Sequence, residues 1–126
     1  MKKLILILVL ISGIFLTGCN KDAQINTFMK DFARTTSEIS EKFDEGKIDE
    51  AKKILDEEKK DLRNEWFYIN SIWSFQASEQ IKKRMSEEPK ANMAELVKSA
   101  NKAIDKYPNE TPKIQAIVND FNNIIK

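Results

Sequence analysis

The chain has 126 residues, which is enough for one small domain. Its 21 basic and 20 acidic side chains give a net charge of +1, so bulk charge provides no basis for binding nucleic acid. It contains no histidine and one cysteine, which removes the commonest general base, the commonest metal ligand and an intramolecular disulfide. We therefore expect no catalytic residues, no metal and no cofactor, and a protein that is not an enzyme.

The N-terminal segment differs in composition from the rest of the chain. Two lysines precede an apolar run over residues 4–15, which has the length of a signal-peptide core and is shorter than the roughly 20 residues of a membrane-spanning helix. The run ends in Leu16-Thr17-Gly18-Cys19, which resembles the lipobox of bacterial lipoprotein precursors. The resemblance implies cleavage after Gly18 and a covalent diacylglycerol with acyl chains such as palmitate on Cys19.

This resemblance also implies a domain organisation and a location. Residues 1–18 would form the signal peptide, residues 19–21 the lipid anchor and a short tether, and residues 22–126 the helical domain. The protein would be held on the cell membrane or the outer membrane, facing outside the cytoplasm. Asn20 stands where inner-membrane lipoproteins of enteric bacteria tend to carry Asp, which favours the outer membrane in a Gram-negative source.

Apolar residues spaced three and four apart follow the tether along the whole remaining chain, and this spacing predicts an all-α fold. The first stripe predicts a helix over residues 22–45, which Gly46 ends. No Gly or Pro interrupts the chain from Ile48 to Glu88. We therefore expect one long helix over residues 49–86, with a bend allowed in its charged stretch.

Two shorter helices are expected after Pro89, which should close the long helix. Asn92 and Glu95 resemble a capping box and predict a helix over residues 92–107. Thr111 and Pro112 resemble an N-cap followed by a first-turn proline, and they predict a last helix over residues 112–125. The sequence therefore predicts a small bundle of three to four helices.

An aromatic segment near the middle of the chain has apolar residues on more than one face. The predicted core stripe of this segment consists of Leu62, Trp66, Ile69 and Trp73. The apolar residues that extend beyond the stripe are Phe67, Tyr68 and Phe75. A helix that is apolar nearly all round is either central in its bundle or covered by a partner, so these three residues are candidate partner-binding residues as well as candidate core.

The neighbouring charges predict a solvated surface. Three carboxylates, at residues 57, 58 and 61, are interleaved with cations at residues 59, 60 and 63, and such spacing on a helix is typical of mutually supporting ion pairs.

The expected function is that of a membrane-anchored, non-catalytic helical module that binds a protein partner at the cell envelope. Immunity proteins, entry-exclusion proteins and accessory subunits of envelope complexes are the candidate classes. The alternative is a carrier of lipid or of a small hydrophobic ligand, in which the aromatic face would line a cavity between helices.

Overall fold

The computed structural model describes residues 21–73 and 79–126, and nearly all of these residues lie in α-helices and in short π-helical or 3₁₀ turns next to them. The helices are α2 (Lys21–Asp44), α3 (Ile48–Tyr68), α4 (Glu79–Lys106) and α5 (Thr111–Asn122). A π-helical turn (Ile69–Trp73) follows α3, and 3₁₀ turns precede and follow α5 (Pro108–Glu110 and Asn123–Ile125). The predicted all-α bundle is confirmed. The proposed signal peptide, Cys19 and Phe75 lie outside the described residues.

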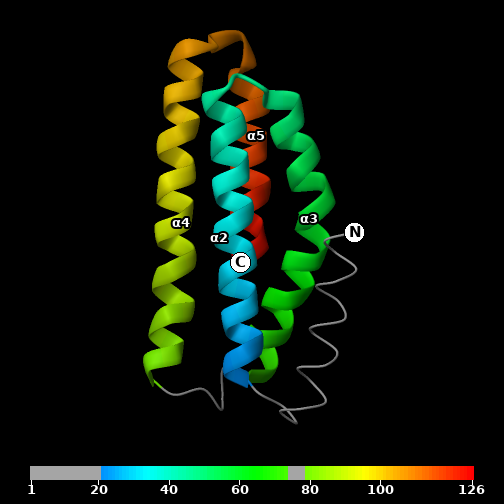
Figure 1. Ribbon diagram of the computed structural model, residues 1–126, viewed down its shortest axis with the longest axis vertical. Coiled ribbons are helices and arrows are strands. Elements are labelled where there is room, and N and C mark those ends of the chain that lie inside the picture. Colours follow the sequence, from blue (N-terminus) through cyan, green and yellow to red (C-terminus); the bar gives the residue numbers. More distant parts are fainter. Residues whose placement is uncertain (1–20, 74–78) are drawn as a thin grey trace.

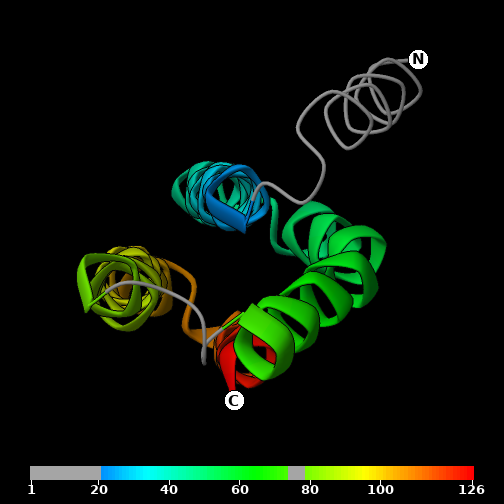
Figure 2. The same ribbon diagram turned by 90° about the horizontal axis from the view of Figure 1, so that it is seen from below.

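The four helices form a bundle in which successive helices run in opposite directions (Figure 1). Seen along the bundle, α2 lies between α3 and α4, and α5 packs between the same two helices on the other side (Figure 2). The lower end of the bundle in Figure 1 is the end where α2 and α4 begin and α3 ends. The upper end holds the turns that join α2 to α3 and α4 to α5.

The single long helix expected over residues 49–86 is wrong. Helix α3 ends at Tyr68, and α4 begins at Glu79 and runs in the opposite direction. Reversing the chain lets α4 pack along α2, whose apolar stripe α3 alone would leave uncovered. The segment between α3 and α4 contains no glycine or proline, so local sequence signals do not predict that the chain reverses there.

Pro89 does not close a helix, and the predicted helix start at Asn92 is also wrong, because α4 continues through both positions to Lys106. Pro89 is buried in the core stripe of α4, which repeats every three or four residues on both sides of it. Burial of this face against α2 and α5 therefore outweighs the local cost of a proline inside a helix.

The first and last helices closely match their predictions. Helix α2 ends at Asp44, and Gly46 follows with a positive φ of 75°. Helix α5 and its following turn cover residues 111–125. The Thr111 side chain does not cap α5 as expected, because its hydroxyl donates to the carbonyl of Pro108 at 2.7 Å.

Aromatic side chains from different helices contact one another in the core. Phe28 packs against Trp66 with ring centroids 5.2 Å apart, and Phe32 packs against Phe121 at 4.8 Å. Leu62 and Ile69 are buried as predicted, whereas Trp66 is only partly buried. The buried apolar residues run from Ile25 to Ile124, so the described residues supply a continuous core.

Helix α5 is much shorter than its neighbours, and this shapes the lower half of the bundle. At 1.5 Å per residue, its 12 residues span about 18 Å, whereas the 28 residues of α4 span about 42 Å. Helix α5 starts at the upper end and stops well short of the lower end, where α3 leans toward its C-terminus (Figures 1 and 2). Among the described helices, none is long and apolar enough to cross a membrane.

Candidate functional site

The outer surface of α3 carries the most exposed aromatic side chain of the described residues. Phe67 is 72% exposed and its neighbour Tyr68 is 45% exposed. Lys60, Arg63 and Asn64 lie one and two turns before Phe67, and spacings of three and four residues place all of them on one face of the helix. We call Lys60, Arg63, Asn64 and Phe67 the α3 patch.

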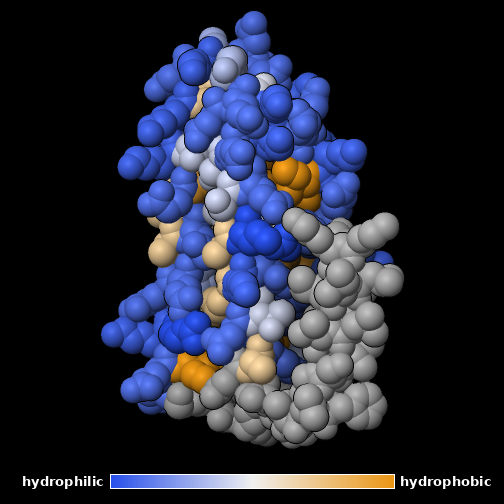
Figure 3. Space-filling view, in the orientation of Figure 1, coloured by the Kyte–Doolittle hydropathy of each residue, from blue (hydrophilic) through white to orange (hydrophobic). Residues whose placement is uncertain are grey.

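The α3 patch is positively charged. Lys60 and Arg63 form no ion pair with the residues that the structure describes. Lys59, at the edge of the patch, is already paired, with its Nζ 3.8 Å from a carboxylate oxygen of Asp56 and 3.8 Å from one of Asp120. The patch thus combines an exposed aromatic ring with two cations that have no ion-pair partner among the described residues. The face of the molecule drawn in Figure 3 is mostly hydrophilic.

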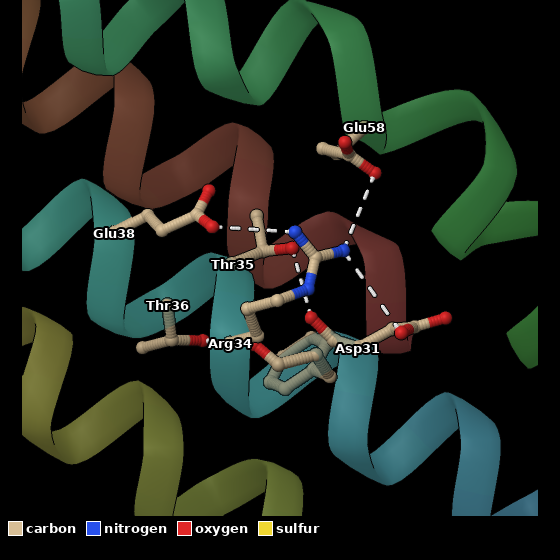
Figure 4. Close-up of polar contacts among 7 residues, drawn as sticks. Asp31, Arg34, Thr35, Thr36, Glu38 and Glu58 are labelled. Carbon is tan, nitrogen blue, oxygen red and sulfur yellow. Dashed lines mark hydrogen bonds and ion pairs between the residues drawn. The ribbon is translucent and has the colours of Figure 1, made fainter. Parts of the chain in front are cut away.

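A cluster of charges lies on the opposite side of α3, where this helix meets α2 (Figure 4). The guanidinium of Arg34 extends from α2 among carboxylates of both helices. Its shortest contact is to Glu38 at 3.3 Å, and it lies 3.9 Å from Asp31 and 4.0 Å from Glu58 of α3. The predicted solvated surface is therefore only partly correct, because Glu58 faces α2.

Glu65 is the least satisfied carboxylate of this cluster. Its Oε2 atom is buried and has no hydrogen-bond partner. Burial, and then the negative charges of Asp31, Asp61 and Glu58, raise the pKa of Glu65 to about 7, although Arg34 opposes this. Burial also raises the pKa of Asp31.

Sequence reasoning missed Glu65, although the sequence carries a signal for it. Glu65 lies three residues after Leu62 and four before Ile69, so it occupies the middle of the predicted core stripe. An acidic residue at such a position is expected to be partly buried, and burial is the main cause of its raised pKa.

The charge cluster does not provide a metal centre. Among the described residues, no group of three or more His, Cys, Asp or Glu side chains could hold a metal ion. The space among Asp31, Glu38 and Glu58 is taken by the guanidinium of Arg34. The cluster joins α2 to α3, and the raised pKa values of Glu65 and Asp31 predict that the stability of this interface depends on pH.

Comparisons of the chain with protein-family models, with curated proteins and with solved structures found no match. Functional inference therefore depends on the chain's own residues. Of the predicted partner-binding residues, Phe67 and Tyr68 lie side by side in sequence at the exposed end of α3, and Phe75 lies outside the described residues.

Proposed function

We propose that this protein is a bacterial lipoprotein that is anchored by Cys19 and binds a protein partner without catalysing a reaction. The lipobox resemblance of Leu16-Thr17-Gly18-Cys19 supports the anchor. Helix α2 begins at Lys21, two residues after Cys19, so the anchor would attach at the lower end of the bundle. Each buried methylene of a lipid contributes about 0.8 kcal/mol, so two or more acyl chains hold a protein stably on a membrane.

The observation that supports partner binding best is the 72% exposure of Phe67 next to two cations that have no ion-pair partner in the described part of the chain. Aromatic residues and arginine are the side chains most enriched at the energetic centres of protein interfaces. A partner surface with an apolar centre and acidic residues around it would complement the α3 patch. Confinement of both proteins to one membrane would raise their effective concentration.

The site of action would be the cell membrane or the outer membrane, on the side away from the cytoplasm. Immunity, entry exclusion and support of an envelope complex are the roles that such a module could serve. The carrier alternative requires Phe67 and Tyr68 to line a cavity between helices. Both side chains lie on the outer surface of α3, so these residues give the carrier no support.

Replacing Cys19 with Ala in the full chain tests the anchor. We expect the wild-type protein in the membrane fraction with acyl chains on Cys19, and we expect the variant as an unprocessed precursor or as released protein. Asn20→Ala is the matched control, because it leaves the lipobox intact. Normal processing and unchanged membrane attachment of the Cys19→Ala variant would overturn the anchor.

A photo-reactive amino acid at Asn64 tests the partner. Asn64 lies within the α3 patch, so ultraviolet irradiation of living cells should link the full chain to one protein in a defined ratio. The Phe67→Ser substitution should abolish this product, and Val97→Ser, at a 39% exposed position on α4, should not. Cross-links to lipid alone would show that the patch rests on the bilayer and would contradict the proposed protein partner.

A further inference from the structure

A hollow lies on the side of the bundle that α5 leaves uncovered. It has a volume of about 320 Å³ and lies between the end of α3, the first three turns of α4 and Ile125 near the C-terminus. Because α5 stops above this level, no described helix fills the space between α3 and α4 here (Figures 1 and 2). Ligand sites in proteins commonly have volumes from about 300 Å³ upward.

One side of the hollow is apolar. Met85 and Pro89 lie one turn apart on α4, and both are buried. Trp66 of α3 and Ile125 complete this surface and are partly buried. Four apolar side chains from three segments therefore surround a space that an acyl chain can enter without exposing more apolar surface to water.

Next to the apolar residues, the lining of the hollow carries hydrogen-bond donors. Lys82, Ser86 and Lys90 follow one another at spacings of four along α4, which aligns them in one row beside Met85 and Pro89. Asn70 adds an amide from the turn after α3. None of the described residues that line the hollow carries a side-chain carboxylate, in a chain that has nearly as many acidic as basic residues.

The two lysines of this row form few ion pairs within the described part of the chain. Lys90 forms no ion pair there. Lys82 lies 3.8 Å from Glu79, a residue whose side chain is 94% exposed and which does not line the hollow. The Nε1–H group of Trp66, which also lines the hollow, is buried and has no acceptor.

From this arrangement we propose that the hollow binds an anionic amphiphile with a single acyl chain. Lys82 and Lys90 hold the carboxylate or phosphate headgroup, and the chain lies against Trp66, Met85, Pro89 and Ile125. A neutral amphiphile would offer no negative charge to the two ammonium groups, and a cationic one would be repelled by them. The site is distinct from the α3 patch, and the proposal does not depend on lipidation of Cys19.

Calorimetric titration of residues 20–126 tests the proposal, because the buried apolar core lies within this fragment. The probes are dodecanoate and lauroyl-lysophosphatidylglycerol, each below its critical micelle concentration. Dodecanol and dodecyltrimethylammonium have the same chain length without the negative charge. We expect both anions to bind saturably, one molecule per chain, and at least about tenfold more tightly than either control, because a hydrogen bond to a charged group supports such a ratio.

Substitutions locate the bound ligand. Lys82→Gln combined with Lys90→Gln should weaken anion binding about tenfold or more. Ser86→Trp places a large ring in the hollow from an exposed position and should abolish binding, while Lys102→Gln, at an exposed position nearer the other end of α4, should change nothing. Circular dichroism confirms that each variant is folded.

The outcomes separate the possibilities. Tighter binding of dodecanoate identifies a fatty acid as the natural ligand class, and tighter binding of the lysophospholipid identifies a phospholipid headgroup. Equal binding of dodecanol, binding that survives Ser86→Trp, or no saturable binding of either anion would overturn the proposal.

Discussion

Replacing Glu65 with Gln should stabilise the protein at alkaline pH and leave it nearly unchanged in mild acid. The Oε2 atom of Glu65 is buried without a partner, and its pKa is raised from 4.5 to about 7, chiefly by burial. The folded protein therefore binds a proton at Glu65 more tightly than the unfolded chain does. The resulting stabilisation is complete below pH 4.5 and is lost as the pH rises through about 7.

The size of the effect follows from the same shift in pKa. A change from 4.5 to about 7 corresponds to about 3 kcal/mol of unfolding free energy at its full extent. The side chain is partly exposed, and solvent screening reduces this to about 2 kcal/mol. Glutamine has nearly the same shape as glutamate and carries no charge, so the Glu65→Gln variant should retain this stability at pH 8.

Urea denaturation of residues 20–126, followed by circular dichroism at pH 5 and pH 8, measures the effect. The variant should exceed the wild type by about 2 kcal/mol at pH 8 and by much less at pH 5. Glu95→Gln, at an exposed position on α4, is the matched control and should show the same small difference at both pH values. The reasoning is refuted if the advantage of Glu65→Gln does not grow between pH 5 and pH 8.

Three further substitutions test other parts of the fold by the same denaturation assay. Arg34→Gln removes the cation that faces Asp31 and Glu58, so it should lower the free energy of unfolding by about 1 kcal/mol at pH 8 and by less at pH 5. An equal loss of stability at both pH values would contradict the pH dependence of this interface. Gly46→Ala should lower the free energy of unfolding by about 2 kcal/mol, because φ at Gly46 is 75° and the added Cβ would lie 2.6 Å from Cζ of Tyr107. An unchanged stability would show that the turn relaxes to accept the side chain. Pro89→Ala should raise the free energy of unfolding by about 1 kcal/mol, because the restored helical hydrogen bond outweighs the lost burial of the ring. A loss of stability would show that packing of the ring contributes more than the hydrogen bond.

The parts of the fold that the sequence predicts are those determined by local chemistry. The stripe of α2 and the glycine after it mark a helix and its end without reference to the rest of the molecule. The same holds for α5, whose apolar spacing covers residues 111–125. These features depend on neighbours three or four residues apart, which a single sequence displays directly.

The errors arise where contacts between distant residues decide the structure. The chain reverses between α3 and α4 because the reversal brings α4 into contact with α2. No residue between Ile69 and Glu79 is a glycine or proline, so no local signal predicts the reversal. Helix α4 continues through Pro89 because its whole apolar face, on both sides of the proline, is buried against α2 and α5. In both cases tertiary packing outweighs a local preference.

The sequence pattern predicts the exposed aromatic residues of α3, but it does not predict the charge cluster between α2 and α3. The helical pattern places Phe67 and Tyr68 outside the core stripe, and both side chains are exposed. The burial of Glu65 follows from its place between Leu62 and Ile69 in that stripe. Its raised pKa, however, depends on Asp31 of another helix, which sequence spacing cannot place.

The two ends of the bundle are held together differently, and the difference bears on function. At the upper end, Gly46 turns tightly against Tyr107, and short connections join the helices. Toward the lower end, α5 no longer covers the bundle, Glu65 keeps an unpaired carboxylate oxygen and Trp66 keeps an unpaired indole N–H. Unpaired buried groups and unfilled apolar space both reduce stability. In natural proteins, such destabilising features occur chiefly at functional sites, where a ligand or a partner binds. This is a physical reason to search for both the protein partner and the amphiphile in the half of the molecule nearest the start of α2.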